Sequence, residues 1–322
     1  MEFLYLLEKI RTPILNAFFS VFTQFGDEII ALGIICIIFW CVNKNLGYEM
    51  GFSFFAAGML VQALKITFRI DRPWDLDKNF LPVGSSPDDL TKISVVDSFM
   101  AKVKEDASGY SFPSGHTQCA TALYSSLAMF FKKTWLKILC VVMFLLVAFS
   151  RMYLGVHTPN DVIVSMVLTL ICVIVMHSVF SKIENNKKYD LAIAFVLAGV
   201  SVAVMVYSII LDVTNVIDSE YALDCCKTGG AGLGFAIGWF IERKWINFDV
   251  KTNKLWHQFV KLIVGIGVAL LLKELPKIVF GALIEESVLA EQVIGMFRYA
   301  LVTIWVVGVF PYFIKKLCNK KA

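Results

Sequence analysis

Three short groups of polar and ionisable residues stand beside long apolar runs in this 322-residue sequence. Polar side chains next to membrane-spanning segments cost free energy, so they are candidates for function. The groups are Lys65 with Arg72 and Pro73, then Pro113-Ser114-Gly115-His116, then Ser150-Arg151 with His157 and Asp161. Together these residue types suit the chemistry of a phosphate ester.

Three of these residues, Lys65, Arg72 and Arg151, supply fixed positive charges. Arginine forks match the oxygens of a phosphate, and lysine adds a point charge. Ser114 and Gly115 precede a predicted helix, whose first backbone N–H groups can point at an anion, and glycine permits close approach. The pattern therefore predicts an oxyanion site that stabilises negative charge on phosphate oxygens in a transition state.

Two of the four histidines in the chain belong to these groups. His157 and Asp161 are four residues apart, and Thr158-Pro159 between them is typical of a helix start. Asp161 could then accept the Nδ1–H of His157 and leave Nε2 free as a nucleophile. His116 could protonate the leaving oxygen and later activate water.

Each polar residue taken singly has a structural alternative. An arginine at a membrane interface often reaches only for lipid headgroups. We expect a structural role for His177 and His257, which lie at the ends of apolar runs away from the three groups.

The three groups resemble the signature of the type 2 phosphatidic acid phosphatase superfamily of membrane lipid phosphatases. That signature reads Lys, six residues, Arg-Pro; then Pro-Ser-Gly-His; then Ser-Arg, five residues, His, three residues, Asp. Here it runs from Lys65 to Arg72-Pro73, through Pro113 to His116, and from Ser150 to Asp161, with every defining position matched. One Pro-Ser-Gly-His alone would be a weak signal, but the ordered combination is specific.

The resemblance implies a role for each matched residue. His157 would be the nucleophile that forms a phosphohistidine, Asp161 would orient it, and His116 would be the acid on the leaving group. The phosphate would be held by Lys65, Arg72, Ser114, Gly115 and Arg151. The resemblance also implies an all-helical fold, an active site at the extracytoplasmic end of the bundle, and no metal or other cofactor.

The composition agrees with a polytopic membrane protein. Hydrophobic residues make up 58% of the chain, charged residues 17%, and the mean hydropathy is +0.71. A net charge of +4, with no basic face or domain, argues against nucleic-acid binding. With about 20 apolar residues per span, nine spans are predicted, at 29–42, 47–67, 116–131, 134–153, 160–181, 189–211, 229–242, 256–272 and 289–314.

These spans predict an all-α bundle with a six-span phosphatase core, residues 29–211, and about three further spans in a C-terminal extension, 212–322. Residues 1–28 form a separate segment, in which Leu4 to Phe25 are expected to form one interfacial amphipathic helix. The polar loop 72–115 is long enough to be functional or disordered.

Charge predicts the orientation in the membrane. Lysines and arginines are concentrated in one set of connections, which is therefore predicted to be cytoplasmic. These residues are Lys44, Lys132, Lys133, Lys137, Lys182, Lys187, Lys188, Arg243, Lys244, Lys251, Lys254, Lys315, Lys316, Lys320 and Lys321. A multi-pass protein of the cell membrane follows, with its C-terminus in the cytoplasm and its N-terminus, the loop 72–115 and the active site outside.

Glycines at positions 230, 234 and 238 recur every fourth residue in the seventh predicted span. Small residues at this spacing allow two helices to approach closely in a membrane. We therefore expect close helix packing here.

The leading functional hypothesis is an integral membrane phosphatase of lipid phosphates or pyrophosphates, such as undecaprenyl pyrophosphate or a phosphatidate. The three extra spans leave open a sphingoid-base phosphate or a soluble ester such as glucose 6-phosphate, because similarly lengthened relatives act on those substrates. A transporter or scaffold for phospholipids is the non-enzymatic alternative. The expected partners are the phosphorylated lipid and the surrounding membrane lipids, without nucleic acid, and the oligomeric state stays open.

Overall fold

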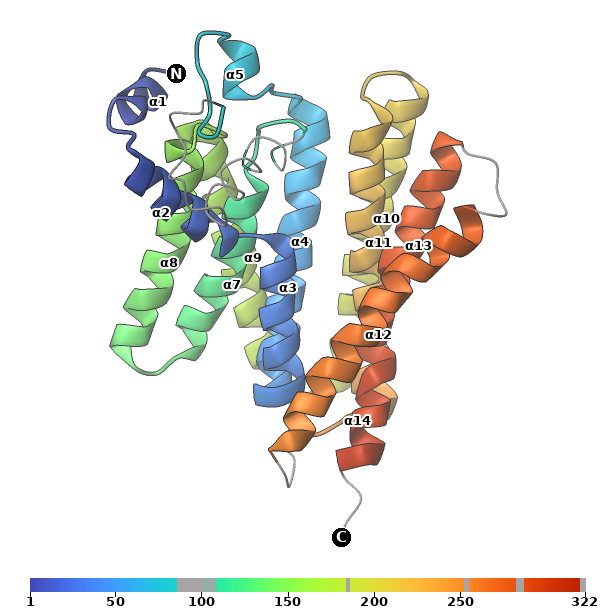
Figure 1. Cartoon of the computed structure of the whole chain (residues 1–322). Coiled ribbons are helices and arrows are strands. Elements are labelled where there is room, and N and C mark those ends of the chain that lie inside the picture. The colour runs from blue at the N-terminus through green and yellow to red at the C-terminus, as the bar shows by residue number, and fades with distance from the viewer. Residues whose placement is uncertain are drawn as a thin grey trace. The chain divides into compact units, whose positions relative to one another are not determined.

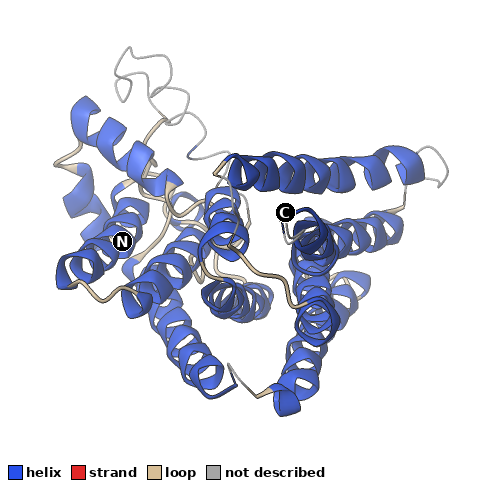
Figure 2. Ribbon diagram, turned by 90° about the horizontal axis from the view of Figure 1, so that it is seen from below, coloured by secondary structure: helices blue, strands red, loops and turns tan. Residues whose placement is uncertain are grey.

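A computed structural model describes residues 1–85, 103, 107, 109–183, 186–251, 255–281 and 287–318 of the chain. Within these ranges every regular element is a helix, as Figures 1 and 2 show. The predicted all-α class is therefore confirmed. Most of the predicted loop 72–115 lies outside the described residues.

The chain packs as two compact units. Unit 1 comprises Met1–Leu32 and Leu64–Val173, and unit 2 comprises Gly33–Ala63 and Ile174–Ala322. Unit 1 contains α1 (Glu2–Glu8), α2 (Pro13–Gln24), the start of α3 (Glu28–Ile37), the end of α4 (Lys44–Phe68), α5 (Pro73–Leu76), α7 (Gly115–Phe130), α8 (Thr134–Tyr153) and the first part of α9 (Pro159–Ile183). All eight residues singled out for phosphate chemistry belong to unit 1.

Unit 2 contains the remaining parts of α3, α4 and α9 and the elements that follow. These are η1 (Ile38–Val42), η3 (Lys187–Tyr189), α10 (Asp190–Val213), α11 (Ser219–Ile241), η4 (Glu242–Ile246), α12 (Trp256–Gly281), α13 (Val288–Ile304), η5 (Trp305–Val309) and α14 (Phe310–Cys318). The short segments η1, η4 and η5 are π turns that continue α-helices.

All nine predicted spans fall on helices, and the multi-pass architecture is confirmed. Five helical stretches in the described part of the chain are long and apolar enough to cross a membrane, namely Lys44–Leu76, Thr134–Tyr153, Pro159–Ile183, Lys187–Val213 and Val288–Lys316. A sixth results if α2 and the stretch Glu28–Val42, bent by 49° at their junction, form one broken span. The 16-residue α7 extends only about 24 Å, less than the roughly 30 Å hydrocarbon core. The count of nine spans therefore stays a prediction.

The N-terminal segment is two helices, so the prediction of one helix from Leu4 to Phe25 is wrong. α1 ends at Glu8, and α2 begins at Pro13 after Thr12, whose side chain accepts a hydrogen bond from the Leu15 N–H at 3.3 Å. Proline lacks an N–H and its ring clashes with a preceding helical turn, so it is favoured in the first turn of a helix, and here it begins α2.

The core of unit 1 joins α2 to the end of α8. The Phe19 ring lies 4.3 Å from the ring of Tyr153 and 5.4 Å from that of Phe149, measured between centroids. The same cluster includes the fully buried Leu154 and Val156. This packing fixes the short loop between α8 and α9, which carries His157.

In unit 2 the glycines of α11 face α13, which confirms the predicted close packing. A Cβ atom added at Gly230 would collide with the carbonyl oxygen of Met296, and one at Gly234 with that of Ala300. Glycine is needed here because backbone atoms of the facing helix occupy the space that a side chain would take.

We expect Gly234→Val to destabilise unit 2 by about 1–3 kcal/mol, because the facing backbone cannot yield as a flexible side chain could. Gly199→Val, on α10, is the matched control, since a Cβ there meets nothing within 4 Å. Thermal unfolding in detergent checks the pair. Equal melting temperatures for the two variants would contradict the packing argument.

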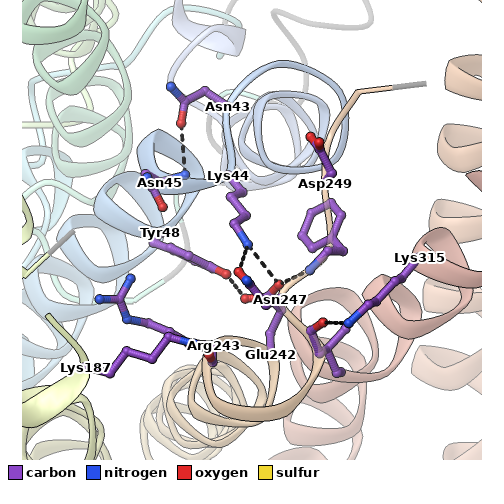
Figure 3. Close-up of polar contacts among 12 residues, drawn as sticks. Asn43, Lys44, Asn45, Tyr48, Lys187, Glu242, Arg243, Asn247, Asp249 and Lys315 are labelled. Atoms are coloured by element: carbon purple, nitrogen blue, oxygen red, sulfur yellow. Dashed lines mark hydrogen bonds and ion pairs between the residues drawn. The ribbon is translucent and has the colours of Figure 1, made fainter. Parts of the chain in front are cut away.

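Four of the basic residues used to predict orientation gather at one end of unit 2 (Figure 3). The fully buried carboxylate of Glu242 accepts hydrogen bonds from Tyr48 and, at 3.4 Å, from the Lys44 ammonium. Lys187 and Lys315 donate to the carbonyl oxygens of Arg243 and Ile246. The basic segments around these four residues, which are distant in sequence, therefore lie at the same end of unit 2. The charge pattern predicted that they would lie on one side. The side of the membrane that this end faces stays a prediction.

Candidate active site

The centre of the site is the contact between Arg72 and His157. Arg72 Nη1 lies 3.0 Å from His157 Nε2, and both side chains are buried. The guanidinium is fixed by two further hydrogen bonds, from Nε to the Gly109 carbonyl at 2.8 Å and from Nη1 to the Val156 carbonyl at 3.0 Å. Arginine can only donate, so Nε2 must accept and the ring proton resides on Nδ1.

On the Nδ1 side of the His157 ring lies a pair of hydrogen-bonded side chains, one of which the sequence analysis missed. Nδ1 lies 3.5 Å from Asp161 Oδ2, which is long for the direct bond expected, and 3.3 Å from Ser111 Oγ. Ser111 Oγ in turn donates to Asp161 Oδ2 at 2.5 Å. The imidazole is therefore tied to the carboxylate chiefly through the Ser111 hydroxyl. A serine two residues before Pro113 was the available signal.

Asp161 also caps α9, which fixes its position. Its carboxylate accepts from the Thr158 N–H at 2.7 Å, while Thr158 Oγ1 accepts from the Asp161 N–H at 3.4 Å. This reciprocal pair is a capping box, and Pro159 occupies the first helical position as predicted. One carboxylate thus starts the helix and orients the catalytic candidate His157.

Three cations act electrostatically on both histidines. The charges of Arg72, Arg151 and Lys65 act on His157 and also on His116. Burial first, and then these three charges, hold the pKa of His157 well below its ordinary value of 6.5. The ring is therefore neutral at neutral pH, the form in which Nε2 can attack a phosphorus atom.

Ser114 is placed differently from the expectation that its N–H would face an anion. That N–H donates to the Asp161 carbonyl at 3.1 Å, and Ser114 Oγ accepts from the Thr117 N–H and hydroxyl as the cap of α7. Gly115 keeps the predicted open approach, since a Cβ there would meet nothing within 4 Å. Of this pair, only Gly115 keeps the role in phosphate binding that the sequence predicts for its backbone N–H, and that role stays a prediction.

We expect Ser111→Ala to lower kcat by about 10–100-fold with little change in KM, because the imidazole loses its tether but the cationic groups remain. Ser126→Ala is the matched control, since this buried hydroxyl donates to a carbonyl of its own helix, that of Ala122, at 2.8 Å. Steady-state kinetics with melting temperatures check both variants. Unchanged kcat in Ser111→Ala would show that Asp161 orients the ring directly.

The arrangement can therefore bind a phosphoryl group beside a neutral, oriented imidazole. Three cations can neutralise its charge, and a second histidine lies within electrostatic reach. No cluster of three or more potential metal ligands of the His, Cys, Asp and Glu types occurs among the residues that the structure describes.

Comparison with known families gives two matches. The model of the PAP2 superfamily matches residues 47–185, which include every residue of the site. The model described as PAP2 superfamily phosphatase, transmembrane extension, matches residues 226–321. No solved structure matches the chain.

Curated relatives are distant. Sphingosine-1-phosphate phosphatase 1 of Rattus norvegicus is 23% identical over 285 residues, covering 86% of this chain, and the Mus musculus protein of that name is 24% identical over the same length. Lipid A 4'-phosphatase of Bacteroides thetaiotaomicron is 25% identical over 169 residues, which is 52% of this chain and 70% of that protein. The chain spans 60% of the length of the two sphingosine-1-phosphate phosphatases.

Proposed function

The chain belongs to the PAP2 superfamily, and from this premise we propose that it is an integral membrane phosphatase that hydrolyses lipid phosphates through a phosphohistidine at His157. The observation that carries the proposal is the contact of His157 Nε2 with Arg72 at 3.0 Å. In this contact Nε2 is unprotonated and accepts from an arginine, a residue type whose guanidinium suits phosphate oxygens.

The proposed reaction has two steps. Nε2 of His157 attacks phosphorus, the bond to the lipid oxygen breaks, and His116 gives that oxygen a proton. His116 then takes a proton from water, whose oxygen attacks phosphorus and releases inorganic phosphate and the free imidazole. Arg72, Arg151 and Lys65 neutralise the phosphoryl oxygens in both steps, and Gly115 adds its backbone N–H.

The substrate that we propose is a lipid phosphomonoester. Three helices that carry residues of the site, α4, α8 and α9, are long and apolar enough to cross a membrane, and the relatives are named for phosphates of sphingosine and lipid A. The match to the sphingosine-1-phosphate phosphatases extends over 86% of this chain, which is too much to leave out the whole of residues 212–322. This favours a sphingoid-base phosphate over undecaprenyl pyrophosphate or a phosphatidate. We place the site at the extracytoplasmic face of the cell membrane.

The test is a phosphate-release panel with the purified protein in detergent. Sphingosine 1-phosphate, phosphatidate, undecaprenyl pyrophosphate, lipid A and glucose 6-phosphate are the substrates. We expect the fastest release from a lipid monoester, unchanged by EDTA and blocked by orthovanadate, which mimics five-coordinate phosphorus. Faster hydrolysis of glucose 6-phosphate would overturn the lipid assignment, and phosphate binding without turnover would favour a transporter or scaffold.

A further inference from the structure

The helix α2 lies outside the residues 47–185 that the PAP2 model matches, yet it packs against α8 within unit 1 (Figure 1). Its exposed face is apolar, with Ile14 80% exposed, whereas its buried face carries a polar stripe. The stripe consists of Asn16, Ser20 and Thr23, which are 1%, 0% and 1% exposed. A helix on a water-facing surface would be oriented the other way. The polar stripe therefore needs partners inside unit 1.

Two members of the stripe contact α8. Asn16 Oδ1 accepts a hydrogen bond from the Tyr153 hydroxyl at 3.0 Å. Thr23 Oγ1 accepts one from Arg151 Nη1 at 2.8 Å, and both of these side chains are buried. A bond to a guanidinium in a buried site is stronger than one between neutral groups, because the charge is poorly solvated there.

The residues after α2 lie close to the Pro113–His116 motif. A Cβ at Gly26 would lie 2.8 Å from the carbonyl oxygen of His116 and 2.5 Å from Val147 Cγ1. The turn at Gly26 therefore lies directly against the first turn of α7. Residues 23–26 therefore contact two parts of the proposed site. Thr23 contacts Arg151, which would hold the phosphate, and Gly26 lies against the backbone of His116, which would protonate the leaving group.

We infer that Thr23 is a positioning residue for phosphate binding and that it acts by fixing the Arg151 guanidinium. The inference rests on the proposed function, because Arg151 matters only if the site binds a phosphoryl group. Thr23 does not touch the substrate. Its hydroxyl holds the guanidinium at one end, so that the remaining donors keep a fixed direction toward the phosphoryl oxygens.

The experiment measures orthovanadate binding by calorimetry, which needs no turnover. Thr23→Val keeps the shape and removes the hydroxyl, and we expect about tenfold weaker binding. Thr23→Ser restores the hydroxyl and should recover wild-type affinity. Ser20→Ala is the matched control, since the Ser20 hydroxyl has no hydrogen-bond partner among the described residues. It should bind vanadate like the wild type.

A double-mutant cycle with Arg151→Ala separates positioning from packing. If Thr23 acts through Arg151, Thr23→Val should weaken vanadate binding no further in the Arg151→Ala background. Full affinity in Thr23→Val, failure of Thr23→Ser to recover it, or an additive loss in the double variant would each overturn the inference. Vanadate binding by a wild-type protein that releases no phosphate would instead overturn the proposed function alone.

Discussion

Replacement of His157 by alanine should lower phosphate release by about four orders of magnitude or more, because the variant lacks the nitrogen on which the proposed covalent intermediate forms. The expected protein is folded and still binds vanadate, since the three cations remain in place. Steady-state release of inorganic phosphate from the best lipid substrate is the primary measurement. Activity within about tenfold of the wild type would show that His157 is not the nucleophile.

The control for this variant is His257→Gln, which changes a histidine of unit 2 outside the proposed site. It should keep wild-type kinetics. A second measurement examines the intermediate itself, because a phosphoenzyme quenched during turnover of a labelled substrate should carry its label at residue 157. The bond should be labile in acid and stable in base, as expected for a phosphoramidate. Label found on a serine or an aspartate would contradict the mechanism.

Replacement of Arg72 should give the second largest loss, about 10²–10³-fold in kcat/KM for Arg72→Ala, because one preorganised donor group at the phosphoryl oxygens is removed. Arg72→Lys should be nearly as impaired. The guanidinium donates from two nitrogens, Nε to the Gly109 carbonyl and Nη1 to the Val156 carbonyl and His157 Nε2, and the one nitrogen of an ammonium cannot occupy both positions.

The matched control for Arg72 is Arg69, an exposed arginine three residues earlier whose φ of 50° lies in the left-handed region. Arg69→Asn tolerates that backbone conformation and should retain activity. The kinetics of both variants are measured with melting temperatures and vanadate affinity. If Arg72→Lys matched the wild type, charge alone would suffice and the fixed geometry of the guanidinium would be irrelevant.

The features that could be predicted from the sequence depend on residues close together in the chain or on a family pattern. Apolar runs near 20 residues long predicted the helices. The start of α9 at Thr158-Pro159 was predicted from capping preferences, which act between residues at most four positions apart. The gathering of Arg72, Asp161 and His157 followed from the order and spacing of three motifs. Each of these depends on residues close in sequence or on a pattern shared with a family.

The N-terminal segment shows why a correct local pattern can still mislead. The spacing of polar and apolar residues from Leu4 to Phe25 fits a helix at a membrane surface, and equally a helix that turns its polar stripe inward and its apolar face outward. Helix propensity cannot separate the two, because it does not depend on which face of the helix is buried. Only the contact of Thr23 with Arg151, 128 residues away, decides.

The sequence by itself determined the all-helical membrane architecture and the family, and it gave the set of residues that we propose bind and attack a phosphate. Only the tertiary structure decided that Ser111 stands between His157 and Asp161, that the Ser114 N–H is used by the Asp161 carbonyl, and that α2 lies against the site. The physical reason is the distance along the chain over which each interaction acts. Helix formation and capping are settled within a few residues, whereas a hydrogen-bond partner is decided by differences below 1 Å between segments that only packing brings together.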